Sequence, residues 1–105
     1  MIVRTWHGCV LLEHAEGFAT HLDLTDVRHS QGIEGNKGAF VKRVTQRSWE
    51  HFFLATYWED IEAVKAFARN DYHVAVTYLD DDKFRLLSDP YVFQHEHEVE
   101  VVHPL

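Results

Sequence analysis

A tyrosine–histidine pair, Tyr72 and His73, follows a stretch in which Trp58 ends an apolar strand and a helix begins. Histidine titrates near neutral pH and serves as a general base, and tryptophan and tyrosine can wall an apolar pocket. The three residues therefore indicate either one side of a catalytic pocket or the polar rim of a packed core.

Other side chains extend this candidate site. His7 on the first predicted strand is a second candidate base, and it faces the same way as Cys9. Arg4 can donate to developing negative charge, or can simply pair at a sheet edge. The candidate pocket walls are four aromatic residues and one threonine: Trp6, Trp58, Phe67, Tyr78 and Thr77. The default alternative for the aromatic residues is that they simply pack in the core.

The nine histidines are scattered along the chain, and no metal-spaced cluster is evident. His95 and His97 lie two residues apart, on one face of a strand, but no third ligand accompanies them. The run Asp80–Asp82 lacks the glycine and final glutamate of a calcium loop, so a turn or a helix start is expected. Cys9, the one cysteine, excludes an intrachain disulfide and is either a small buried residue or a nucleophile. We expect no metal and no cofactor.

Hydrophobic periodicity predicts the elements that position these residues. Alternation predicts strands over residues 2–11, 39–46, 49–58 and 91–102, the middle two forming a hairpin. Three- and four-residue spacing predicts helices over 12–22 and after Trp58, where Asp60 is the N-cap. Short helical pieces are expected over 24–30 and 71–79. On the last strand, the face of Val92, Gln94 and Glu96 is predicted to be the solvent face.

This order of elements predicts one domain over residues 1–105 with an α+β, ferredoxin-like βαββαβ fold, an antiparallel sheet with helices on one face. Both faces of the third strand are partly apolar or aromatic, with Phe52, Leu54 and Trp58 on one side and Trp49, Phe53 and Tyr57 on the other, so the uncovered face carries an apolar patch in either case. A patch of that kind is unusual in water, so we expect a homodimer to bury it.

Composition excludes several classes of protein. The net charge is −7, and residues 55–105 hold eleven acidic but four basic side chains, so no basic stripe for nucleic acid is present. No apolar run reaches the roughly 20 residues of a membrane span, and the N-terminus lacks the layout of a signal peptide. We therefore predict a cytoplasmic protein.

The chain resembles the antibiotic biosynthesis monooxygenase-like domains of the dimeric α/β-barrel superfamily over nearly its whole length. The resemblance lies in the opening strand "MIVRTWHGCV", in "FFLATYWEDIEAVKAFARNDYHVAV" and in the closing strand "YVFQHEHEVEVV". It implies a ferredoxin-like protomer, a homodimer whose sheets form a barrel, and a pocket between sheet and helices. It also implies oxygenation of aromatic polyketides or quinols without metal or flavin.

Haem-degrading proteins share that fold and carry an Asn on the first strand, a Trp in the second long helix and a His ten residues later. His7, Phe67 and Thr77 stand at the matching positions here. Haem binding and degradation is therefore disfavoured.

Two functions remain open. The first is a cofactor-independent monooxygenase for a small aromatic or quinol-like substrate, with His73, His7 and Tyr72 as catalytic candidates. The second is a non-catalytic dimeric domain that binds a small hydrophobic molecule or serves a stress response. A side chain that can act as a base inside a pocket between sheet and helices would separate them.

Overall fold

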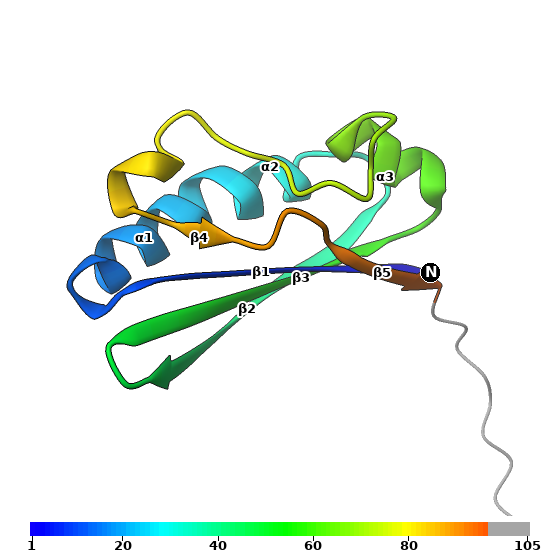
Figure 1. Cartoon of the computed structure of the whole chain (residues 1–105). Helices are drawn as coiled ribbons and strands as arrows, with labels where there is room; N and C mark the ends of the chain where they lie inside the picture. The colour runs from blue at the N-terminus through cyan, green and yellow to red at the C-terminus, as the bar shows by residue number, and fades with distance from the viewer. Residues whose placement is uncertain (97–105) are drawn as a thin grey trace, which may run out of the picture.

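A computed structural model describes residues 1–96 of the chain. The predicted strand residues 97–102, with His97, lie outside this range. The described part has two layers, with the helices on one face of an antiparallel sheet (Figure 1). The predicted ferredoxin-like α+β fold is thereby confirmed.

Strand β1 (Ile2–Leu11) lies at the centre of the sheet. On one side it pairs with β3 (Trp49–Trp58), which pairs with the edge strand β2 (Asn36–Gln46). On the other side it pairs with two short strands, β4 (Leu87–Ser88) near its end and β5 (Phe93–Glu96) near its start. The predicted closing strand is therefore represented, among the described residues, by β5.

Alternation along β1 and β3 separates two faces of the sheet, as predicted. The inner face, against the helices, carries Arg4, Trp6, Phe52 and Leu54, all of them buried. The outer face carries residues of intermediate exposure, including His7, His51, Phe53 and Tyr57. The two faces differ because successive side chains of a strand point to opposite sides of the sheet.

The first helical region is continuous but irregular. A 3-10 turn η1 (Leu12–His14) leads into α1 (Ala15–Leu22), then a π-helical turn η2 (Asp23–Val27), then α2 (Arg28–Gln31). The wider π turn inserts an extra residue into the helical repeat, so Asp26 and Val27 are both buried toward the sheet. π turns are rare in proteins, and those that occur often lie at functional sites.

Helix α3 (Ile61–Ala68) begins and ends where local chemistry requires. The Asp60 carboxylate accepts the Ala63 amide at 2.9 Å, which confirms the predicted N-cap. Arg69 ends the helix with a φ of 66°, in left-handed backbone. None of the helices within residues 1–96 is long and apolar enough to span a bilayer.

The helical turns predicted over residues 71–79 are wrong. The chain there is irregular, and the single bridge Val74–Tyr91 is its sheet contact. The Arg4 guanidinium binds the carbonyls of Tyr72 and Val74, which removes those acceptors from a helix. The 3-10 turn η3 (Asp81–Phe84) follows, so the predicted turn at the aspartate run is confirmed.

The predicted solvent face of the last strand is wrong for Val92 and Gln94, whereas Glu96 is exposed as predicted. Gln94 pairs with Arg4 and Phe93 pairs with Thr5. Paired residues share a face, so Val92 and Gln94 point under the helices and are half-buried, while Phe93 lies on the outer face, 67% exposed. The register of β5 with β1 determines which of its side chains point toward the helices, and this register cannot be read from the sequence of the strand alone.

Candidate functional site

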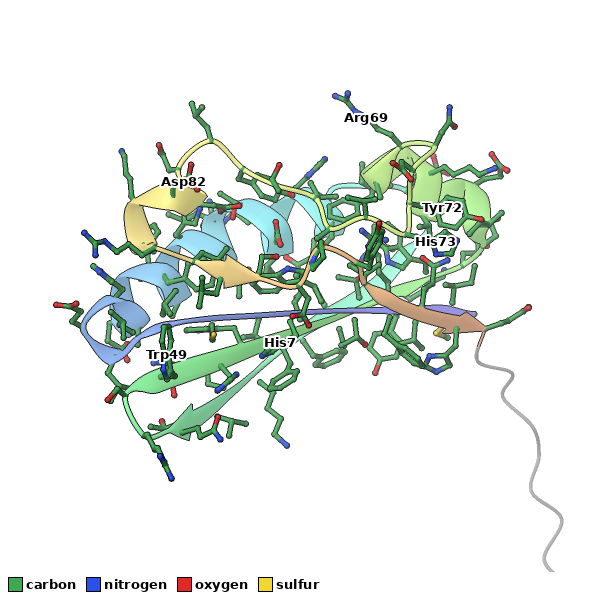
Figure 2. All side chains as sticks on the ribbon, in the orientation of Figure 1. His7, Trp49, Arg69, Tyr72, His73 and Asp82 are labelled. Atoms are coloured by element: carbon green, nitrogen blue, oxygen red, sulfur yellow. The ribbon has the colours of Figure 1, made fainter. Side chains whose placement is uncertain are left out.

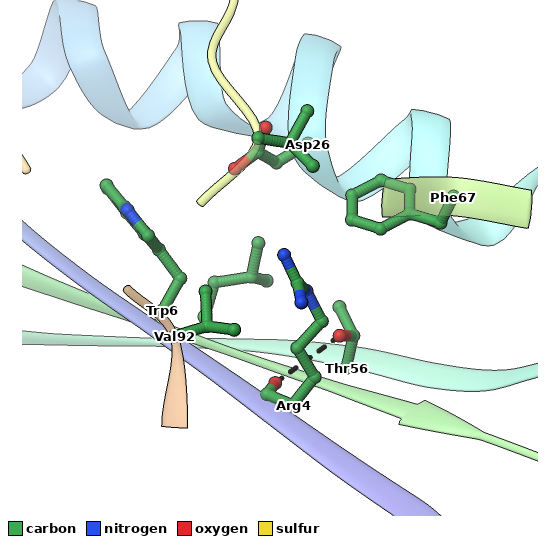
Figure 3. Close-up of a pocket in the computed structure, with 8 residues that line it drawn as sticks. Arg4, Trp6, Asp26, Thr56, Phe67 and Val92 are labelled. Carbon is green, nitrogen blue, oxygen red and sulfur yellow. Dashed lines mark hydrogen bonds between the residues drawn. The ribbon is translucent and has the colours of Figure 1, made fainter. Parts of the chain in front are cut away.

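A small cavity lies between the inner face of the sheet and the helix layer (Figure 3). Its volume of about 10 Å³ is that of roughly one water molecule. Strand β1, strand β3, the π turn, helix α3 and the irregular segment all contribute to its wall, which is formed by Arg4, Trp6, Asp26, Leu54, Thr56, Phe67, Val76 and Val92.

Asp26 is the unusual residue of this wall. Its side chain is buried, and its Oδ1 has no hydrogen-bond partner. Burial, reinforced by the nearby Asp81 carboxylate and partly offset by Arg4, raises the pKa of Asp26 from its usual value to about 8. The carboxyl therefore holds a proton at neutral pH and can exchange it there, which suits general acid–base chemistry.

Arg4 faces the same cavity from β1 but forms no ion pair with Asp26. Its Nη1 donates to the Tyr72 carbonyl, and its Nη2 donates to the Val74 carbonyl at 3.0 Å. The guanidinium also lies 5.8 Å from the centre of the Phe67 ring. Burial lowers the pKa of Arg4 to about 10, with Asp26 acting in the opposite direction, so Arg4 stays charged at neutral pH.

A second cavity of about 10 Å³ lies on the other side of Asp26, against η3. Asp81 lines it and accepts from two groups: the His21 ring at 2.8 Å and the Tyr78 amide at 2.9 Å. Trp6 also lines it, and its indole N–H donates to Ser88 at 2.8 Å. The polar groups of Asp81 and Trp6 thus have hydrogen-bond partners, whereas Oδ1 of Asp26 has none.

A larger open cleft of about 480 Å³ lies beyond the inner cavity, between helix α3 and the irregular segment. His29 of α2 contacts both walls: its Nδ1 lies 2.8 Å from the Tyr78 hydroxyl, and its ring centre lies 4.7 Å from that of Phe67. Burial, with Asp26 and Asp81 nearby, raises the pKa of Tyr78, so its hydroxyl stays protonated. The volume is in the range of small-molecule sites.

Phe67 and Val76 line both the inner cavity and the open cleft. These two side chains form the partition between a space that can hold an organic ring and a buried carboxyl. A molecule in the cleft therefore lies one side-chain layer from Asp26, and that layer must move aside before a water in the inner cavity can reach the molecule.

The structure brings six of the predicted site residues together. Arg4, Trp6 and Phe67 line the inner cavity, and Phe67, Thr77 and Tyr78 line the cleft. The sixth, Tyr72, takes part through its backbone carbonyl, while its ring packs beside Lys65 and His73.

Three predicted residues lie elsewhere. His7 is on the outer face of the sheet, and His73 is exposed beside Tyr72, so neither reaches the inner cavity (Figure 2). Trp58 is a core residue and not a pocket rim: it is fully buried, stacks on Phe67 at 5.3 Å and donates to Thr56 at 2.8 Å.

Sequence reasoning missed Asp26 and His29. A signal for Asp26 was present, because it lies four residues after Leu22 and eight after Phe18, on the apolar stripe of the helix. A carboxylate at such a position is seldom buried without a partner. His29 had no comparable signal, because its partners Phe67 and Tyr78 are distant in sequence.

Comparison with known proteins supports the fold. No protein-family model and no curated protein matches the chain. Among solved structures, a protein from Deinococcus radiodurans, for which antibiotic biosynthesis monooxygenase activity is proposed, matches with a TM-score of 0.64. The match covers 100% of this chain and 99% of that one, at 16% identity. The chain has the antibiotic biosynthesis monooxygenase-like fold. At this identity the likeness establishes the monooxygenase-like fold and leaves chemistry to the site.

The buried carboxyl predicts a specific pH dependence of stability. The folded-state pKa of Asp26, about 8, lies above that of an unfolded aspartate, about 3.9. The folded state therefore binds the proton more tightly, and the stabilisation it provides is lost as pH rises toward 8. The free energy of unfolding of the wild type should fall relative to Asp26→Asn by up to about 1.4 kcal/mol per pH unit between pH 5 and 8.

Denaturant unfolding of both proteins at several pH values measures this difference. Asp82→Asn, at an exposed aspartate, is the matched control and should follow the wild type. Parallel curves for wild type and Asp26→Asn would show that Asp26 is ionised throughout.

Proposed function

We propose that the chain is a cofactor-independent monooxygenase that binds a small phenol or quinol in the open cleft and uses Asp26 as proton acceptor. The observation that supports this best is the partnerless, buried carboxyl with a pKa of about 8 beside an apolar partition. The monooxygenase-like fold agrees with it.

The chemistry needs little from the protein. Loss of the phenolic proton gives an anion that transfers electrons to O₂ more readily than the neutral phenol does. A phenol and O₂ give a quinone and water, with all four electrons supplied by the substrate, so no external reductant enters. The protein must remove the proton, keep the ring out of water and stabilise negative charge on oxygen.

The residues around the cleft match these three tasks. Asp26 in its ionised form takes the proton, through the one water that the inner cavity can hold. Phe67 and Val76 present apolar surface to the ring. Arg4 supplies a fixed positive charge, because its guanidinium is held by two backbone carbonyls. The base role thus moves to Asp26 from His73, His7 and Tyr72, whose side chains do not line the inner cavity.

One observation favours the non-catalytic alternative. The inner cavity holds about one water, so an organic ligand is confined to the open cleft and does not contact Asp26 directly. A binding domain would use the cleft in the same way without turnover. Haem remains disfavoured, because His7, Phe67 and Thr77 stand where the haem-degrading proteins carry Asn, Trp and His.

We further propose that the protein is a homodimer formed through the outer face of the sheet. Two aromatic side chains there are about two-thirds exposed: Phe40 and Phe93. Together with Phe53 and Tyr57 they form an aromatic surface on a sheet face that no helix covers. A second copy would bury it in a self-complementary contact.

The oxygenase proposal predicts oxygen consumption with a panel of phenols and hydroquinones, without added metal or flavin. Because the ionised form of Asp26 is the base, kcat/KM should rise with pH and level off above about pH 8. Asp26→Asn should lower kcat by about 10² or more, the usual contribution of a general base. An oxygen electrode measures both.

The matched control is again Asp82→Asn, whose activity should equal that of the wild type. Ligand binding without oxygen uptake across the whole panel would contradict the proposal and leave the binding-domain alternative. Equal kcat in Asp26→Asn and wild type would remove Asp26 from the mechanism.

The dimer proposal predicts that Phe93→Glu yields a folded monomer, since the exposed ring contributes little to the fold of one copy. Light scattering coupled to size exclusion measures the mass. Leu79→Glu, on the irregular segment and 98% exposed, is the control and should stay dimeric. A wild-type protein that is monomeric at high concentration would contradict the proposal.

A further inference from the structure

Two histidines on the outer face of the sheet point ring nitrogens at each other. His7 of β1 and His51 of β3 place Nε2 and Nδ1 2.8 Å apart, with ring planes 11° from parallel. Stacked faces stay about 3.5 Å apart, so this shorter contact joins the ring edges. The nitrogen lone pairs therefore converge on one point between the rings.

The far nitrogen of each ring is also held. His7 Nδ1 lies 3.0 Å from the Asp89 carboxylate, and His51 Nε2 lies 3.0 Å from the Gln46 side-chain oxygen. Both of these partners are acceptors, so both far nitrogens carry hydrogen and both inner nitrogens are left to share a single cation.

The hydrogen bonds to the far ring nitrogens are those commonly found around metal-bound histidines. A metal-bound histidine commonly donates its other N–H to a carboxylate or carbonyl, which fixes the ring and raises its basicity. Asp89 and Gln46 do this for the two rings. The ligands come from adjacent paired strands, and both rings are partly exposed, so an ion and its waters can reach the inner nitrogens.

We propose that His7 Nε2 and His51 Nδ1 bind one divalent transition-metal ion of the zinc class. Bonds of about 2.0–2.1 Å in tetrahedral geometry separate two ligand nitrogens by about 3.3 Å, so the present contact must open by roughly half an ångström. Small rotations of the two rings achieve this. The site is independent of the proposed oxygenase chemistry. Both ligands belong to one copy, and they lie on the same outer face as the proposed dimer contact, with His7 stacked on Phe53.

The site uses two protein ligands and leaves its other positions to water. Within residues 1–96 no group of three or more His, Cys, Asp or Glu side chains is arranged around one ion. Cys9 lies opposite His51 on the same face, but burial and the nearby Asp89 raise the pKa of its thiol, which disfavours the thiolate. Lys42, opposite Phe53, adds a positive charge near the site and limits the affinity.

Isothermal titration of the full chain with ZnCl₂ near neutral pH tests the proposal. The titration uses a Cys9→Ser background, so that a thiol cannot bind the ion. We expect one ion per chain. His51→Gln and His7→Gln should each abolish this binding, and Asp89→Asn should weaken it about tenfold or more, as loss of an outer-shell partner does.

His14→Gln is the control, because His14 lies in the 3-10 turn η1, away from the pair, and its loss should leave binding unchanged. Circular dichroism establishes that each variant is folded. Zinc uptake that survives in both His7→Gln and His51→Gln would overturn the proposal. So would a wild type that binds no zinc.

Discussion

The site depends on one buried guanidinium. Arg4 comes from the central strand, lies under the helix layer and binds the carbonyls of Tyr72 and Val74. Buried charges are costly unless they are hydrogen-bonded, and these two carbonyls supply part of that compensation. The same bonds fix an irregular segment that makes few other backbone contacts. The wall of the cleft is therefore positioned by a side chain nearly seventy residues away.

Asp26 follows from this arrangement. The π turn brings its carboxyl to the cavity that Arg4 lines, but the Arg4 guanidinium is held at the carbonyls of Tyr72 and Val74, and no ion pair forms. Desolvation then outweighs attraction, and the carboxyl retains its proton to unusually high pH. Had the two groups met in an ion pair, the carboxylate would be stable and inert. Keeping them apart leaves a group that can exchange a proton near neutrality.

Much of the fold was predictable from the sequence, because it rests on local patterns. Alternation predicted β1, β2 and β3, and the Asp60 cap located the start of α3. The failures concern residues whose environment is set by distant partners. Gln94 turned inward because it pairs with Arg4, and Trp58 became core because Phe67 covers it. The pairing of His7 with His51 joins two strands and has no local signature.

The candidate site was predictable in its walls more than in its chemistry. Trp6, Phe67 and Tyr78 were recognised as aromatic residues on the faces that meet. Histidine is the expected base, because its ordinary pKa lies near neutrality. The pKa of Asp26 reaches that range only through burial, which residue type alone does not indicate. The spacing from Phe18 and Leu22 places Asp26 on the apolar stripe, but the π turn there cannot be read from residue types, since it changes the helical repeat within a single turn.

The measurement that bears most directly on this account is the titration of the Asp26 carboxyl carbon by NMR, assigned by comparison with Asp26→Asn. The account predicts a midpoint near pH 8, with the carboxyl protonated at neutral pH. A midpoint near pH 4, that of an ordinary aspartate, would mean that Asp26 is solvated or paired and would contradict its role as the proton acceptor.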